Sequence, residues 1–166
     1  AMSSLLLNDM DEVEEIIKRV GKQSVVAVLD IKKKTFGNKY EIYTHNGTKA
    51  TGVEPVFFSK KLEEVGVGEI VINSIDQDGM MKGYDMKLIE NIRDTISIPL
   101  TVLGGAGSLD DIGEVIKEHG IIGVAAGSLF VFKGKFKAVL INYPTPDEKE
   151  ALMEKYFKKI MTNEFI

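Results

Sequence analysis

Three aspartates stand where apolar stretches of this chain end, and they are the first candidates for chemistry. They are Asp30, Asp76 and Asp78. A carboxylate at the end of a buried strand can act as a general acid or base. Asp30 is the strongest candidate, because it ends the apolar run 25–29, where a charge is costly without a purpose. Each aspartate could instead cap a helix or hold a loop, which is the commoner role for any single one.

Glycine segments follow two other apolar stretches and predict a phosphate site. One is Gly104-Gly105-Ala106-Gly107 and the other is Gly127-Ser128. Glycines let the backbone approach an anion closely, and a helix N-terminus adds free N–H donors. Tight turns are the alternative explanation, but two such segments reinforce each other. Neither segment is a dinucleotide-binding or Walker sequence.

The elements that would position these residues alternate along the chain. Apolar, β-branched runs predict strands at 24–31, 69–75, 99–103 and 121–126. Helical spacing predicts helices at 8–20, 54–65, 85–92, 108–119 and 152–160, and 36–44 could form a two-stranded excursion. Such alternation predicts parallel strands with right-handed crossovers.

Two architectures fit this order of elements. One is an open doubly wound sheet, and the other is part of a (β/α)₈ barrel, which normally needs ~250 residues. In both, ligands bind at the carboxyl ends of the strands. We therefore expect the acids and glycines to meet at one edge of the sheet, together with Ser74 and Gly79.

Composition narrows the class of protein. The 166 residues suit one domain, and the net charge of −4 argues against a nucleic-acid binder. The chain has no cysteine, which suits the reducing cytoplasm, and its two histidines form no metal cluster. No apolar run reaches the ~20 residues of a membrane helix. We expect a cytoplasmic protein without metal, membrane or nucleic-acid partners.

Several ordered motifs resemble the cyclase subunit of imidazole glycerol phosphate synthase. They are 26–30 with the lysines that follow, 44–47, 68–79, 83–85, 104–107 and 125–130. The resemblance implies a (β/α)₈ barrel that needs no metal or other cofactor. It also implies a glutamine amidotransferase partner, whose ammonia passes through the barrel and reacts with a phosphorylated ribulosyl intermediate.

The resemblance also implies roles for individual residues. Asp30 matches the catalytic aspartate of the C-terminal half of the barrel, and Glu69 matches the charged ring where ammonia enters. The implied substrate- and phosphate-binding residues are Asn46, Ser74, Asp78, Gly79, Gly104, Gly105, Gly127 and Ser128.

Departures from the family pattern leave three functions open. The N-terminal half, which carries the other catalytic aspartate, has no match here, so we expect one half-barrel domain over 1–166 with a helical tail at 144–166. Asn73 and Leu103 replace small hydroxyl residues, and the tail 130–144 is more similar to paralogues from surface-polysaccharide pathways. The chain could be a histidine-pathway cyclase subunit, its acetamidino-sugar counterpart, or a phosphate-binding half-barrel without turnover. Open sheet edges predict self-association or docking with the missing half.

Overall fold

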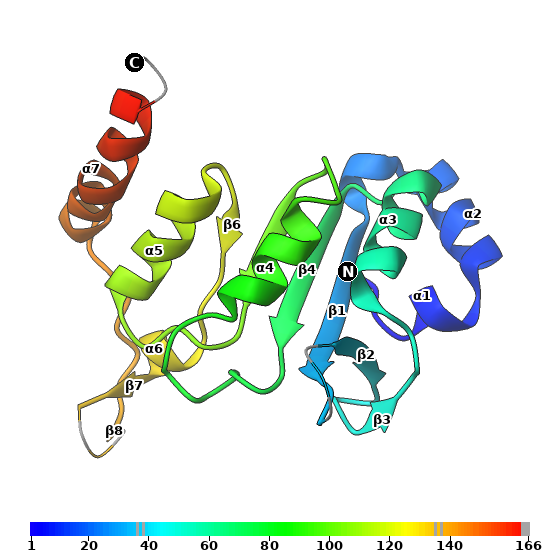
Figure 1. Ribbon diagram of the computed structural model, residues 1–166, viewed down its shortest axis with the longest axis horizontal. Helices are drawn as coiled ribbons and strands as arrows, with labels where there is room; N and C mark the ends of the chain where they lie inside the picture. The colour runs from blue at the N-terminus through cyan, green and yellow to red at the C-terminus, as the bar shows by residue number, and fades with distance from the viewer. Residues whose placement is uncertain (36, 38, 135, 137, 164–166) are drawn as a thin grey trace.

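The computed structural model describes residues 1–35, 37, 39–134, 136 and 138–163. Its main sheet has six strands in the order β3-β2-β1-β4-β5-β6 (Figure 1). Four of them run parallel, and these are β1 (Val26–Lys33), β4 (Glu69–Ser74), β5 (Leu100–Leu103) and β6 (Gly123–Val124). The four expected strands are therefore confirmed, although β6 is shorter than the apolar run that predicted it.

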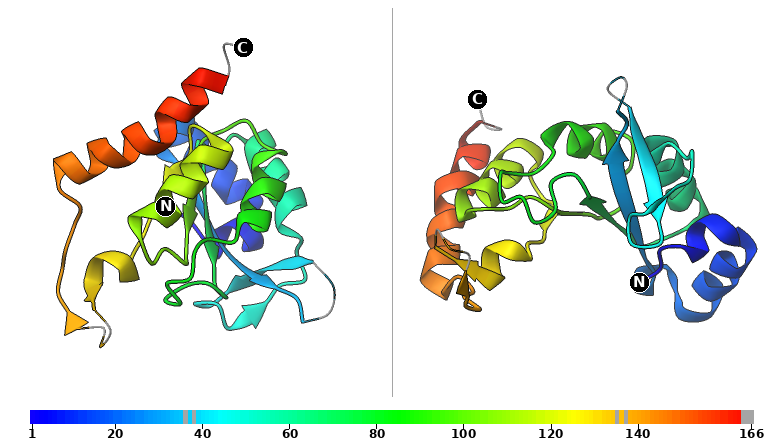
Figure 2. Two further views of the ribbon diagram at one scale, coloured as in Figure 1. Left: turned by 60° about the vertical axis from the view of Figure 1, so that its left-hand side comes forward. Right: turned by 90° about the horizontal axis from the view of Figure 1, so that it is seen from below.

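Helices connect the parallel strands and lie along one side of the sheet. α3 (Pro55–Val65), α4 (Met86–Arg93) and α5 (Leu109–His119) form a row on its convex side (Figure 2). α1 (Leu5–Asn8), α2 (Met10–Val20) and a 3₁₀ turn (Lys22–Ser24) precede β1. A curved parallel sheet with its helices outside is a segment of a (β/α)₈ barrel.

Local capping signals explain where these helices begin. The Asp9 carboxylate accepts a hydrogen bond from Glu12 N at the start of α2, as Asp85 does from Leu88 N at the start of α4. Ser108 forms the predicted capping box at the start of α5. Because these bonds span only three residues, the sequence alone could predict them.

Side chains of the parallel strands alternate between two environments. Leu29, Ile72 and Val102 are buried on the face that the helices cover. The other face is half-buried, and there the register sets Asp30 beside Asn73. This second face lines the concave side of the sheet, so polar residues on it are available to a ligand.

The excursion after β1 pairs with β1 itself. β2 (Tyr40–Thr44) runs antiparallel to β1, and β3 (Lys49–Ala50) pairs with β2; residues 36 and 38 lie outside the described part. Met2 forms a parallel bridge with Ala27, donating to Val26 O at 2.8 Å. The two outer edges of the sheet are therefore β3 and β6, not β1.

The C-terminal segment contains elements that its sequence did not predict. A short helix, α6 (Ser128–Val131), leads into a hairpin of β7 (Phe132–Lys133) and β8 (Ala138–Val139). The expected tail helix is α7 (Pro146–Asn163), which packs on α5. Tyr156 OH and Lys155 Nζ both donate to Asp110 Oδ1, at 2.9 and 2.7 Å. None of the described helices is both long and apolar enough to cross a membrane.

Candidate functional site

A cavity of about 230 Å³ lies at the carboxyl ends of β1 and β4. Its lining residues are Asp30, Asn46, Gly47, Asn73, Ile75 and Asp78. Three residues predicted from the sequence therefore meet here, namely Asp30, Asn46 and Asp78. They come from one strand and from two loops, which the parallel pairing of β1 with β4 brings together.

Asn73 positions the carboxylate of Asp30. Its Nδ2 donates to Asp30 Oδ1 at 2.9 Å. A carboxylate can only accept, so the amide nitrogen must face it, and the amide oxygen then points elsewhere. That oxygen is buried, and no described residue donates a hydrogen bond to it. Sequence reasoning missed this role, although Asn73 was a visible signal as a polar residue following the apolar run 70–72.

The loop after β4 packs tightly against the loop after β5. Gly83 N donates to Gly105 O at 3.0 Å. A Cβ at Gly105 would overlap with Gly83 O, and one at Gly107 would overlap with Met81 O. Gly105 also has a φ of +120°, which L side chains rarely adopt. The glycines are therefore required for this close backbone approach, whether or not they also bind an anion.

The loop after β6 reaches the same place. A Cβ built at Gly79 would lie 4.0 Å from Ser128 Oγ, so these two predicted residues are neighbours. Among the described residues, no atom lies within 4 Å of a Cβ built at Gly127. Tyr84 OH donates to Ala125 O at 2.7 Å and ties the loop after β4 to the chain that follows β6. The three loops form one surface beside the cavity.

Ser74 and Gly104 occupy supporting places. The Ser74 side chain is buried on the helix-covered face, near Tyr84 and Leu88, while its carbonyl accepts from Asp78 N at 2.9 Å. A Cβ at Gly104 would lie 2.7 Å from Ser74 O and 3.0 Å from Asn73 Oδ1. Neither residue lines the cavity, and both support the neighbouring loops through the backbone.

Asp76 holds a loop and does not line the cavity. Its Oδ2 accepts from Lys33 N at 2.8 Å. This is the alternative role that the sequence left open for each of the three aspartates. Asp30 and Asp78 remain the acids that face the cavity.

Glu69 lies at the amino end of β4, away from the cavity. Its Oε1 accepts from Thr101 Oγ1 at 2.6 Å. Thr101 is in register with Gly123, where a Cβ would overlap with Thr101 Oγ1. The glycine therefore leaves room for the hydroxyl that holds Glu69.

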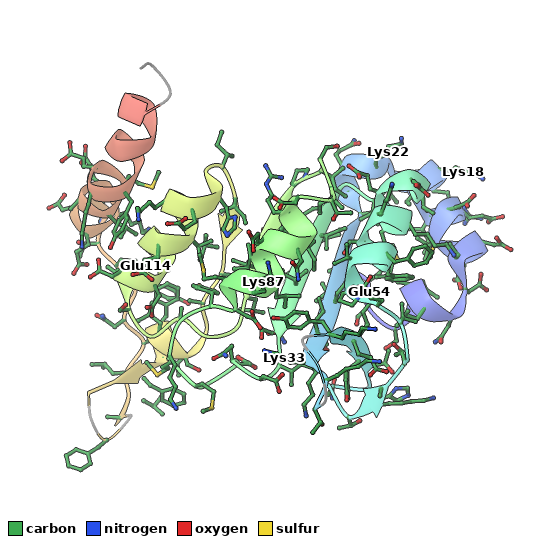
Figure 3. All side chains as sticks on the ribbon, in the orientation of Figure 1. Lys18, Lys22, Lys33, Glu54, Lys87 and Glu114 are labelled. Atoms are coloured by element: carbon green, nitrogen blue, oxygen red, sulfur yellow. The ribbon has the colours of Figure 1, made fainter. Side chains whose placement is uncertain are left out.

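Three lysines lie close to Asp30 in the chain, although none of them lines the cavity. Lys32, Lys33 and Lys34 follow Asp30 within two to four residues, and Figure 3 shows Lys33 near the carboxyl end of the sheet. Lys34 Nζ lies 3.3 Å from Glu41 Oε2, and Lys32 Nζ lies 5.7 Å from the centre of the Tyr43 ring. Because Lys34 is paired with Glu41, attraction of an anionic ligand to this edge would come from Lys32 and Lys33, against the carboxylates of Asp30 and Asp78.

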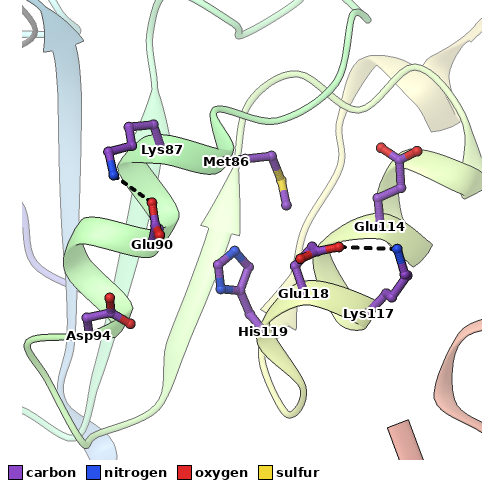
Figure 4. A pocket seen from close by; sticks show the side chains of 8 residues that line it. All are labelled: Met86, Lys87, Glu90, Asp94, Glu114, Lys117, Glu118 and His119. Carbon is purple, nitrogen blue, oxygen red and sulfur yellow. Dashed lines mark hydrogen bonds and ion pairs between the residues drawn. The ribbon is translucent and has the colours of Figure 1, made fainter. Parts of the chain in front are cut away.

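A larger hollow of about 720 Å³ lies elsewhere, between α4 and α5 (Figure 4). Charged side chains line most of it, including the pairs Lys87–Glu90 and Lys117–Glu118, at 2.7 and 3.2 Å. Burial lowers the pKa of His119, which also lines it. We place the functional site at the smaller cavity, because ligands of parallel α/β folds bind at the carboxyl ends of strands. Within the described residues, no three His, Cys, Asp or Glu side chains could hold a metal ion.

Comparison with known proteins decides the family. Residues 1–137 match the family model described as "Histidine biosynthesis protein". The chain belongs to this family. Its members are TIM-barrel proteins, which agrees with the curved parallel sheet, and the match confirms the resemblance seen in the motifs.

Relatives in this family extend the comparison. A Vibrio vulnificus protein is 47% identical over 154 residues, which cover 93% of this chain and 59% of the relative. A Leptospira borgpetersenii protein is 52% identical over 151 residues, covering 91% and 59%. Both bear the name "Putative imidazole glycerol phosphate synthase subunit", hisF3 and HisF respectively.

A third relative bears a similar name and is more distant. "Imidazole glycerol phosphate synthase subunit HisF" from Hyphomonas neptunium is 36% identical over 132 residues, covering 80% of this chain and 52% of the relative. The chain thus spans between half and three-fifths of the length of these relatives.

Proposed function

We propose that this chain is the C-terminal half of a cyclase-type subunit that uses ammonia, with Asp30 as its acid or base. The observation that carries the proposal is the strand-end cavity, where the Asp30 carboxylate is held by Asn73 and Asp78 lies nearby. The names of the relatives support the reaction of imidazole glycerol phosphate synthase. The substrate would be a phosphorylated ribulosyl compound in histidine biosynthesis.

The phosphate group of this substrate would bind to the surface formed by the three loops. Gly79 and Ser128 are neighbours there, and Gly105 and Gly127 would complete the surface. Backbone N–H groups of such loops bind anions well, and the nearby lysines add attraction. Asn46 and Asp78 would contact the polar part of the substrate inside the cavity.

A glutamine amidotransferase would supply ammonia at the opposite end of the sheet. Glu69 lies there, held by Thr101, and would form part of the entrance. β4 would then run from the ammonia entrance at Glu69 to the phosphate site at Gly79. Residues 1–166 would form one half-barrel domain, with 144–166 as its helical tail.

Substitution of Asp30 tests the catalytic role in the complete protein with its amidotransferase. Asp30→Asn keeps the size of the side chain but removes the acid or base, so we expect at least a ~100-fold loss of ammonia-dependent turnover. Asp76→Asn is the matched control, because Asp76 contacts a backbone amide outside the cavity. Full activity of Asp30→Asn would overturn the proposal.

Asn73 gives a specific reason to keep a second candidate function. Asn73 donates to Asp30, the proposed acid or base, and Leu103 lies in register beside Asn73. Both residues stand where the family resemblance implies small hydroxyl residues. The acetamidino-sugar counterpart would use the same acid on a different phosphorylated substrate. Comparing turnover of the two substrate types by the complete protein would decide between them.

A half-barrel that binds phosphate without turnover is the third candidate. The chain contains one phosphate surface and one of the two acids that the family resemblance implies. Activity of the isolated chain with ammonia and substrate would refute this candidate.

A further inference from the structure

The β1–β2 hairpin is attached to both ends of the loop 75–85. Near the start of the loop, Asp76 Oδ2 accepts from Lys33 N at 2.8 Å. At its end, Tyr40 OH donates to both oxygens of Asp85, at 2.9 and 3.0 Å. The residues of these two contacts are separated by 43 and 45 positions in the chain, so these are tertiary anchors.

The loop between the anchors carries Asp78 and Gly79, and three of its residues have left-handed backbone conformations. Gly79, Met81 and Gly83 all have positive φ, of 72°, 56° and 95°. A non-glycine residue such as Met81 adopts this conformation only when its surroundings enforce it. Inside the loop, Met80 N donates to Gln77 O, and Gly83 N donates to Gly105 O in the loop after β5, both at 3.0 Å. Asp78 N donates to Ser74 O and Tyr84 OH to Ala125 O, and the hairpin adds the two anchors to these constraints.

Tyr40 is well suited to hold its end of the loop. The side chain is only 7% exposed, and burial together with the bond to Asp85 raises the pKa of its hydroxyl well above the usual range. The hydroxyl therefore stays a donor at any physiological pH. Asp85 also accepts from Leu88 N at 3.0 Å, so the same carboxylate caps α4. Asp85 thus links the hairpin, the loop and α4.

We propose that Tyr40 and Asp76 are positioning residues that hold the loop 75–85 so that its backbone at Gly79 can bind a phosphate group while Asp78 stays directed to the cavity. The proposal rests on the proposed function in one respect, namely that this loop binds phosphate. It adds that β2, which lies outside the set of parallel strands, controls the affinity of the site. The site would then loosen when either anchor is removed, even though neither side chain lines the cavity.

The test is an NMR titration of the whole chain with inorganic phosphate, observed at the amides of Gly79 and Ser128. In the unaltered chain these amides should shift and saturate. Tyr40→Phe removes only the hydroxyl and should raise the Kd at least threefold, as should Asp76→Ala. Asp76→Asn keeps an acceptor for Lys33 N and should restore the affinity. Tyr43→Phe is the matched control on the same strand, because its ring still contacts Lys32, and its Kd should be unchanged.

Amide hydrogen exchange of the free protein separates this proposal from the proposed function. Tyr40→Phe should speed exchange at Asp78 and Met80 but not in the β4–β5 ladder. If Tyr40→Phe left the Kd or the exchange rates in the loop unchanged, the positioning role would be overturned. A lower melting temperature as the only effect of the substitution would overturn it as well. If phosphate shifts no amide in the unaltered chain, the proposed phosphate site is wrong, and the exchange rates still decide whether the anchors hold the loop.

Discussion

At the scale of single residues, the direction of the Asp30 carboxylate depends on Asn73. The amide donates to one carboxylate oxygen at 2.9 Å and leaves the other for a ligand. Acids held by a supporting hydrogen bond work better, because a small displacement of a reacting group costs much of the rate. The Asn73 amide oxygen, which accepts no hydrogen bond from any described residue, is the kind of buried polar atom that functional sites retain.

Asn73→Leu tests this support, since leucine has a similar size but no donor. We expect kcat of the complete protein to fall about tenfold or more, with little change in KM, because only the orientation of Asp30 is lost. Steady-state kinetics with ammonia measures both constants. A rise in KM at constant kcat would show instead that Asn73 contacts the substrate.

A second prediction at this scale concerns the close approach of two loops. Gly105→Ala should destabilise the fold by more than about 2 kcal/mol, because the new Cβ overlaps with Gly83 O. Gly52→Ala is the control: its φ is +77°, but no described atom lies within 4 Å of the added Cβ. It should cost only the ~1 kcal/mol of a left-handed conformation. Urea unfolding of the two variants measures their free energies of unfolding. An equal loss of stability in both variants would contradict the prediction.

At the scale of elements, the position of α7 depends on a small residue of α5. A Cβ at Gly113 would overlap with the ring of Tyr156. In an isolated helix, Gly→Ala is stabilising by about 1 kcal/mol. Here the absence of a side chain admits the ring, and Asp110 fixes it by accepting from Tyr156 OH.

We therefore expect the effect of Gly113→Ala to change sign with its partner. In the unaltered chain the substitution should destabilise the protein, and in a Tyr156→Ala background it should stabilise it by up to about 1 kcal/mol. A double-mutant cycle by urea unfolding measures the coupling. The same sign in both backgrounds would show that α7 does not rest on Gly113.

His119, which lines the hollow between α4 and α5, should make the free energy of unfolding depend on pH. Burial lowers the pKa of His119 in the folded protein, opposed by the nearby Glu118, Asp94 and Glu90. The unfolded chain then binds a proton at a higher pH than the folded one, so stability falls as pH drops below about 6.5. His119→Gln should reduce the loss of melting temperature between pH 7.5 and 5.5. An unchanged loss would place its cause in other groups.

At the scale of the whole molecule, the sheet is a barrel segment with an uncovered concave face. Its half-buried residues include Val28, Val71 and Leu103, and its outer edges are β3 and β6. The segment after the β7–β8 hairpin adds exposed apolar side chains, with Ile141 at 70% and Tyr143 at 67% exposure. Uncovered apolar surface and free strand edges favour association.

We expect the isolated chain to self-associate or to bind the remaining part of a barrel. Sedimentation should show species larger than a monomer, and Leu103→Lys on the concave face should shift them toward the monomer. Phe57→Lys is the control, because Phe57 is 70% exposed on α3, outside the sheet. A strictly monomeric, well-folded chain would count against this expectation.

The sequence by itself determined the order of the elements and the acids and glycines at the strand ends. Apolar periodicity and caps such as Asp9, Asp85 and Ser108 act over a few residues, so they can be read locally. Asp30 could be chosen as a candidate for the same reason, because its position at a strand end follows from the apolar residues 25–29 directly before it. The family motifs then agreed with the comparison.

Only the tertiary structure decided which of these residues act together. Asp30 and Asn73 are 43 residues apart, as are Lys33 and Asp76, and each contact depends on the register between β1 and β4 or on the loops beyond it. The apolar alternation of both strands disfavours a shift of one residue, which would turn Asn73 to the other face, but only the pairing itself decides which residue of β4 lies beside Asp30. For this reason the sequence offered Asp30, Asp76 and Asp78 as candidates, with Asp30 the strongest, whereas the fold directs Asp30 and Asp78 to the cavity and uses Asp76 as an anchor.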